Sequence, residues 1–158
     1  EKYSFDGENI GNLLMSVDIV PISLALSQAA IESGWGTSRY ARDGNAIFGQ
    51  YTYDVEVGLL PKERSDGKKY LIRKFSNISE STASYIKNLN THSAYVKFRE
   101  VRKKLRMNGE RMDVGLLAEE LINYSERKNL YIQDIKDMIK ANDFQRFDDI
   151  YTSKSLVN

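Results

Sequence analysis

The chain has 158 residues and a mass of 18.1 kDa, with 41% hydrophobic residues, 28% charged residues and a formal net charge of +1. This composition is typical of one soluble globular domain, and the small net charge gives no global reason for binding nucleic acid or a membrane. The sequence has no cysteine, which excludes disulfides, thiolate catalysis and cysteine metal ligands. We therefore predict a single domain over residues 1–158 with no membrane-spanning segment.

The first predicted elements are helices. Residues 7–18 carry apolar side chains at helical spacing. Pro21 suits the first turn of a second helix, because its missing N–H is harmless there. We expect that helix to end near Ser33, because Gly34 and Gly36 follow and glycine is the residue that most readily ends a helix.

One carboxylate lies in this second helix at a place where the chain otherwise avoids charge. Glu32 is the only charged residue in the range 19–38, and it precedes the only tryptophan, Trp35. Burial of an unpaired carboxylate is costly and raises its pKa toward the range in which it holds and donates a proton. Glu32 is therefore a candidate catalytic acid. The alternatives are a helix-terminal residue bonded to backbone amides and a buried acid paired with Arg39 or Arg42.

A short helix is expected between Thr37 and Gly44, followed by a β excursion at about residues 46–75. The runs TYDVEV and KKYLIRKF alternate in polarity, as strands do, and Asp66-Gly67 is a typical hairpin turn.

Helices return after this excursion. Asn77 and Glu80 form a capping pattern, the range 93–107 predicts a basic helix, and further helices are expected from Asp113 to about Tyr124 and around Tyr131. For the single histidine, His92, we expect a loop or helix-cap role. The basic run is typical of a solvated helix face, with attraction of an anionic wall polymer as the alternative; its members are Lys97, Arg99, Arg102, Lys103, Lys104 and Arg106.

The run SLALSQAAIESGWGTSRYARDGNAIFGQ closely resembles the glucosaminidase domains of glycoside hydrolase family 73, in particular their Bax-type branch. The shared pattern is A-x-E-S-G-W-G, then S-x-[FY]-A, then G-N-x-[IL]-F-G. The resemblance covers roughly residues 17–139, because the segments RKFSNISESTASYIKNLNTHSAYVKFREVR and LINYSERKNLYIQDIKDMI are also similar to the family.

The resemblance implies a mostly helical α+β fold of the lysozyme-like kind with a small β-hairpin lobe. It also implies cleavage of β-1,4 bonds after N-acetylglucosamine in peptidoglycan. Glu32 falls on the family's general-acid position, and Tyr124 falls on a tyrosine thought to act at the reacting centre. The second carboxylate corresponds to Glu63, with Glu56 as the runner-up.

Residues next to these motifs are expected to line a substrate groove. The candidates are Trp35, Asn45, Phe48, Gln50, Tyr51 and Tyr53. Trp35 is alternatively a core anchor, and strand packing is the alternative for the two tyrosines. Whether the reaction inverts or retains configuration depends on the separation of the two carboxyl groups.

The expected partners are peptidoglycan glycan strands, with no nucleic acid, no metal and no cofactor, and the chain is expected to be a monomer. We expect a bacterial envelope location, periplasmic or extracellular. We also expect that a leader or an upstream region has been removed from the chain. The alternative functions are a lytic transglycosylase, a non-catalytic glycan-binding module and an assembly protein that uses its basic helix.

Overall fold

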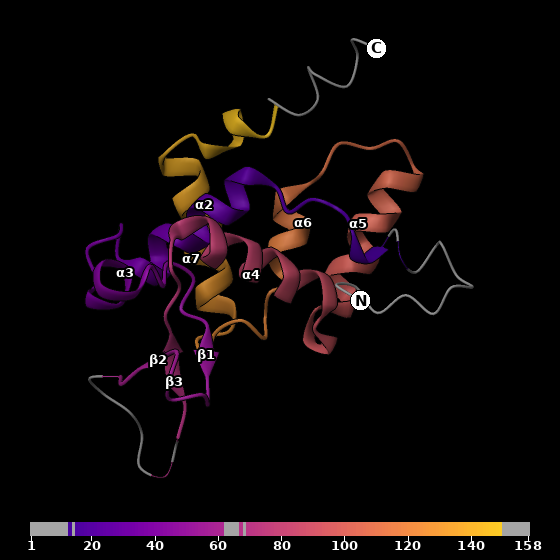
Figure 1. Ribbon diagram of the computed structural model, residues 1–158. Coiled ribbons are helices and arrows are strands. Elements are labelled where there is room, and N and C mark those ends of the chain that lie inside the picture. The colour runs from indigo at the N-terminus through magenta and orange to yellow at the C-terminus, as the bar shows by residue number, and fades with distance from the viewer. Residues whose placement is uncertain (1–12, 14, 62–66, 68, 150–158) are drawn as a thin grey trace. The chain divides into compact units, whose positions relative to one another are not determined.

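The computed structural model describes residues 13, 15–61, 67 and 69–149. The chain forms two compact units, which we name by their content. The sheet unit comprises residues 28–85, and the helical unit comprises the chain before residue 28 and after residue 85. The boundaries fall inside helices α2 (Ile22–Ser33) and α4 (Ile78–Thr91), which are drawn in Figure 1. Whether residues 1–158 act as one domain stays a prediction.

The sheet unit holds one short helix and three short strands, which are α3 (Arg39–Gly44), β1 (Tyr51–Thr52), β2 (Gly58–Leu59) and β3 (Leu71–Arg73). The strands form an antiparallel sheet in the order β1-β3-β2, with β3 in the middle (Figure 1). Ile72 of β3 is paired with Tyr51 on one side and with Leu59 on the other, and its side chain is buried. The mostly helical α+β class is confirmed.

The predicted β-hairpin lobe is instead this three-stranded sheet. The run TYDVEV does not form a strand beyond Thr52, because side chains bond to the backbone within the run itself. Thr52 Oγ1 accepts from the amide of Asp54, and Asp54 Oδ1 accepts from the amide of Glu56. Such local bonds compete with a strand ladder and favour turns. The expected turn residue Asp66 lies outside the described residues.

After α4, the described part of the helical unit continues with η1 (Ser93–Tyr95), α5 (Val96–Met107), α6 (Val114–Glu119), α7 (Asn129–Ala141) and η2 (Phe144–Phe147), in which η marks a 3₁₀ turn. His92 Nδ1 accepts from the amide of Ala94, which confirms a helix-cap role for this histidine. Helix α6 ends five residues before Tyr124, so the prediction of its end was wrong; the chain continues in turns closed by Leu121 and Tyr124.

The core of the helical unit lies where α6 contacts α5 and α7. Its fully buried side chains include Phe98, Leu117, Leu121 and Ile135. The expectation that the basic run is a solvated face was wrong for two of its members. Arg99 is 8% exposed and Arg102 is 1% exposed. Within the described residues, no helix is both long and apolar enough to cross a membrane.

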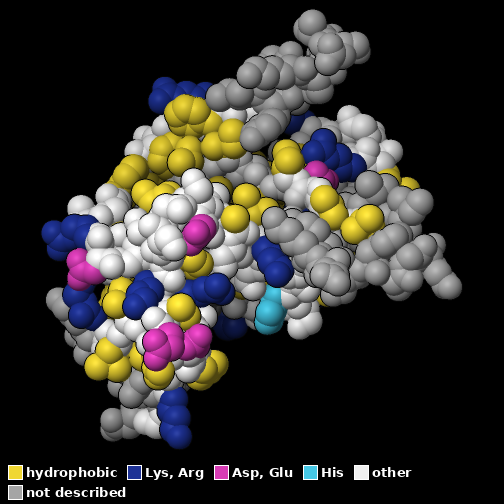
Figure 2. Space-filling model, in the orientation of Figure 1, with side chains coloured by type: hydrophobic (Ala, Val, Ile, Leu, Met, Phe, Trp, Pro, Cys, Tyr) yellow, Lys and Arg dark blue, Asp and Glu magenta, His cyan; other side chains and the backbone are white. Residues whose placement is uncertain are grey.

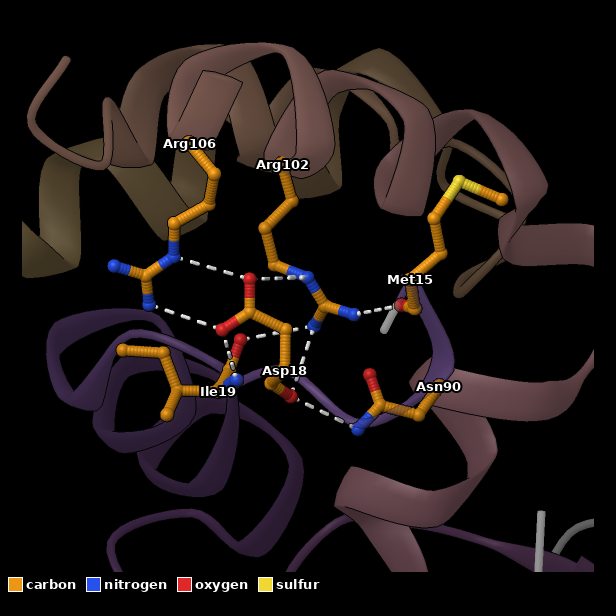
Figure 3. Close-up of polar contacts among 6 residues, drawn as sticks. All are labelled: Met15, Asp18, Ile19, Asn90, Arg102 and Arg106. Atoms are coloured by element: carbon orange, nitrogen blue, oxygen red, sulfur yellow. Dashed lines mark hydrogen bonds and ion pairs between the residues drawn. The ribbon is translucent and has the colours of Figure 1, made fainter. Parts of the chain in front are cut away.

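Arg102 is held by a dense set of oxygen atoms (Figure 3). Its guanidinium donates to the backbone carbonyls of Met15, Asp18 and Ile19, and the Asp18 carboxylate lies 3.7 Å from Nε. The same carboxylate accepts two hydrogen bonds from Arg106, at 2.9 and 3.2 Å. A buried guanidinium needs such partners, because an uncompensated buried charge is strongly destabilising. This cluster joins the segment before α2 to α5.

Asp18 is ionised in the folded protein. Burial alone raises the pKa of Asp18, but hydrogen bonds from Arg106 and the Ile19 amide, with the charge of Arg102, lower the pKa below its ordinary value of 3.8. A lowered folded pKa contributes stability that is present above the unfolded pKa and is lost as pH falls through the folded pKa.

We predict that Asp18→Asn lowers the free energy of unfolding near neutral pH by about 1.5–3 kcal/mol, the usual range for a charged hydrogen bond. Chemical denaturation should show that the difference from wild type narrows as pH falls below 3.8. Asp134→Asn is the control, because Asp134 pairs with Arg127 at an exposed site and should cost less than about 1 kcal/mol. Equal losses in the two variants would contradict this account.

Candidate functional site

Helix α2 ends in a turn that fixes the position of Glu32. The amide of Trp35 donates to the carbonyl of Ala30 at 2.9 Å, and the amide of Gly34 donates to that of Ile31 at 3.4 Å. This pair of bonds is the Schellman motif, which requires a left-handed residue just after the helix, and Gly34 has φ of +56°. Glu32 is therefore held in the last turn of α2, and its side chain is partly buried.

The turn continues with further left-handed residues. Trp35 has φ of +58° and Gly36 has φ of +75°, and Gly36 donates its amide to Ser33 Oγ at 2.7 Å. A bulky residue rarely adopts a positive φ, which costs about 1–2 kcal/mol. Trp35 is 59% exposed, so the interpretation of Trp35 as a core anchor was wrong. The strained turn presents an aromatic ring at the surface, three residues after Glu32.

The loop after α3 passes beside Glu32. Asn45 ends α3 in the left-handed conformation, and its Nδ2 donates to the carbonyl of Phe75 at 3.0 Å. Four residues on, Gly49 also has a positive φ, +61°. A Cβ atom built on Gly49 would lie only 2.9 Å from Oε2 of Glu32. The backbone at Gly49 thus lies against the Glu32 carboxylate. Its positive φ favours glycine, and any larger residue there would move the end of the Glu32 side chain.

Three side chains of the sheet unit support this loop from within. Phe48 is 3% exposed and stacks on the ring of Tyr85, with centroids 4.0 Å apart and planes 6° from parallel. The Tyr85 hydroxyl donates to Gln28 Oε1 at 2.7 Å in a buried hydrogen bond. Gln28 lies one helical turn before Glu32 on α2, so the loop residue beside Gly49 is tied to the same helix that carries the acid.

Gln28 and Tyr85 were missed at the sequence level. The available signal was a polar amide, Gln28, inside the otherwise apolar helix, since such a group must find a partner when it is buried. Phe48, expected to line a substrate groove, is instead buried in the interior of the sheet unit.

Gln50 follows Gly49, and its side-chain oxygen Oε1 has an unusual environment. Its Nε2 donates to Ser84 Oγ at 3.2 Å, whereas its Oε1 is buried and has no hydrogen-bond partner among the described residues. A buried acceptor without a partner is uncommon and often marks a functional position.

The remaining groove candidates lie on the sheet and the loop that follows β1. Tyr51 and Tyr53 are 62% and 79% exposed, and Tyr51 stacks on Tyr70 at 4.2 Å. Glu56 is exposed, and Figure 2 shows hydrophobic and acidic side chains together at the surface of this region. Glu63 lies outside the described residues.

Tyr124 belongs to the helical unit. Its ring stacks on that of Tyr131 at 5.7 Å with planes 3° from parallel, and Tyr95 lies 6.2 Å from it at a tilt. The backbone of Tyr124 is fixed by its amide, which donates to the carbonyl of Leu121 at 2.8 Å. Tyr124 is therefore a partly buried ring in a stack of three tyrosines, placed at the first turns after α6.

Two further predictions concern the surroundings of Glu32. Arg39 donates from Nη2 to the carbonyl of Leu60 and lies over the ring of Tyr40, contacts that serve the sheet unit and not a pair with the acid. Among the residues that the structure describes, no group of three or more potential ligands could hold a metal ion.

Comparison with known proteins agrees with the resemblance to glucosaminidase domains that the sequence motifs indicated. A family model described as "Glucosaminidase: Mannosyl-glycoprotein endo-beta-N-acetylglucosaminidase" matches residues 9–144. The chain is 38% identical to the protein called "Protein bax" of Escherichia coli (strain K12) over 119 residues, which are 75% of this chain and 42% of that protein. The chain thus spans less than half the length of this relative. No solved structure gives a significant match.

We predict that Gly49→Ala lowers the rate of hydrolysis of an N-acetylglucosamine-containing glycan by up to about 100-fold, because the new Cβ, 2.9 Å from Oε2, forces the Glu32 carboxylate out of its position. The measurement is the initial rate per folded protein, with folding followed by circular dichroism.

Gly109→Ala is the matched control. Gly109 has φ of +65°, close to that of Gly49, but nothing lies within 4 Å of its added Cβ. Both variants should lose about 1–2 kcal/mol of stability through the strained backbone, whereas only Gly49→Ala should lose activity. Wild-type turnover by Gly49→Ala would show that the position of the carboxylate does not depend on this contact.

Proposed function

The chain belongs to the Glucosaminidase family of glycoside hydrolases, family 73, and on that basis we propose that it cleaves β-1,4 bonds after N-acetylglucosamine in peptidoglycan. The observation that carries the proposal is the Glu32 carboxylate at the end of α2, held against the backbone of Gly49. We also propose that the fold is lysozyme-like, which the mostly helical composition and the small sheet support.

Glu32 is the general acid in this proposal. Breaking a glycosidic bond needs a proton for the leaving oxygen, and a carboxylic acid is the usual donor. The backbone at Gly49 restricts where the carboxyl group of Glu32 points. A donor with a fixed position accelerates such reactions by about 10²–10⁴-fold.

A second group must face the positive charge that develops on the sugar ring as the glycosidic bond breaks, and there are three candidates for it. Glu63, which follows β2 in the sequence and lies outside the described residues, is the first, and Glu56, exposed between β1 and β2, is the second. A carboxyl separation of about 6.5–9.5 Å would give inversion, and about 5–5.5 Å would give retention. The substrate N-acetyl group, oriented by Tyr124, is the third candidate nucleophile.

Exposed aromatic residues of the sheet unit supply the proposed sugar contacts. Trp35, Tyr51 and Tyr53 each present more than half of their surface to solvent. Flat aromatic faces suit the apolar faces of sugar rings. Asn45 and Phe48 act by holding the loop in place.

The proposal includes a bacterial envelope location, periplasmic or extracellular, and action as a monomer on glycan strands without a cofactor or nucleic acid. A lytic transglycosylase is the second candidate function, because it needs only one acid and Glu32 would suffice.

Product analysis tests the proposal. We predict that incubation with purified peptidoglycan releases fragments with reducing N-acetylglucosamine ends, which mass spectrometry identifies directly. Anhydro-muramic ends would instead assign the transglycosylase reaction. If glycan is retained but no bond is cut, the chain is a binding module, and the proposed hydrolysis is wrong.

A further inference from the structure

A second concave site lies in the helical unit, on the side of α5 that faces the segment before α2. Its volume is about 390 Å³, within the range of small-ligand pockets. Four cationic side chains line it at a spacing that puts them on one face of α5: Arg99, Arg102, Lys103 and Arg106.

Among the described residues that line this pocket, positive charges outnumber negative ones. Asp18 is the one carboxylate among the described lining residues, and it is already bound by Arg106 and Arg102. Figure 3 shows both arginines directed at this carboxylate. Arg99 and Lys103 have no carboxylate partner within the described part of the chain. Two positive charges one helical turn apart therefore remain to be compensated, and mutual repulsion between such neighbours is unfavourable.

Of Arg99 and Lys103, Arg99 is the buried one. Its side chain is more than nine-tenths buried, and Nη1 donates to the carbonyls of Leu89 and His92 at 3.0 and 2.9 Å. Nε and Nη2 make no hydrogen bond among the described residues. Burial lowers the pKa of Arg99, because it disfavours the charged guanidinium. The negative charge of the nearby Glu100 offsets part of this effect. A guanidinium with one edge engaged and the rest unused is a ready donor for an oxyanion.

The other walls of the pocket are apolar. Met15, Val17 and Met107 line it beside the cations. Such walls favour an anionic group attached to an organic body over a fully hydrated ion, since the body removes apolar surface from water. Lys103 at the rim is exposed and adds a mobile ammonium.

We propose that this pocket binds a phosphate group of an organic phosphate, with Arg99 and Lys103 as its ligands. Two cations without acidic partners among the described residues suit the negative charge of a phosphate group, and its free oxygens can accept from both side chains at once. The ligand is a phosphodiester polymer or a small phosphate ester, which share this chemistry. The proposal does not depend on glycan hydrolysis and stands or falls separately from it.

The test is a nitrogen-15 NMR titration of the chain with inorganic phosphate, with sodium chloride of equal ionic strength as the reference. We expect saturable shifts of the amides of α5, with a dissociation constant on the order of 1 mM for this minimal probe. A parallel titration with an oligomer of glycerol phosphate separates the sources. Tighter binding of the oligomer at equal phosphate concentration assigns the polymer, and weaker binding assigns a small ester.

Lys103→Gln and Lys104→Gln form a matched pair, because both lysines are exposed on α5 and only Lys103 lines the pocket. Lys103→Gln should weaken phosphate binding by about fivefold or more, and Lys104→Gln by less than about twofold. Arg99→Gln should abolish binding but also removes a cap of α4, so the lysine pair decides. Absence of saturable shifts, equal effects of the two lysine variants, or equal binding of acetate would overturn the proposal.

Discussion

The contact between the Glu32 carboxylate and the backbone of Gly49 is the constraint on which the candidate active site depends. The two residues come from different elements, the end of α2 and the loop after α3, and they meet because Gly49 lacks a Cβ. Each side is fixed separately. The left-handed Gly34 ends the helix that carries the acid, and the left-handed Asn45 ends the helix that precedes the loop.

The interior of the sheet unit keeps these two sides together. Phe48 stacks on Tyr85, and Tyr85 donates to Gln28, which lies one turn before Glu32. A displacement of the loop would therefore break a buried hydrogen bond and an aromatic stack, each worth about 1 kcal/mol. The same arrangement leaves Trp35 exposed beside the acid, in a backbone conformation that a tryptophan rarely adopts. The loop beside Glu32 is thus supported from the interior of the sheet unit, and an exposed aromatic ring follows Glu32 three residues later.

Local features of the chain could be predicted from the sequence, and contacts between distant segments could not. The end of α2 followed from its glycines, and Glu32 was identified by its isolation among uncharged residues. The contact with Gly49 leaves no periodic signal, because it joins separate elements. The sheet differed from a hairpin because Asp54 forms a turn with its own neighbours. The sequence predicted Arg102 to be a solvated helix residue. It is buried instead and donates hydrogen bonds to backbone carbonyls of residues far away in the sequence.

The most direct test of the central claim compares two leaving groups in Glu32→Gln. A β-1,4-linked sugar needs a proton to depart, whereas a dinitrophenyl group departs without one. Release of each group from an N-acetylglucosamine oligosaccharide should be measured in wild type and variant. If Glu32 is the general acid, the variant cleaves the sugar bond about 10²–10⁴-fold more slowly than wild type but releases dinitrophenol at nearly the wild-type rate. Equal slowing of both reactions, or of neither, would contradict the assignment.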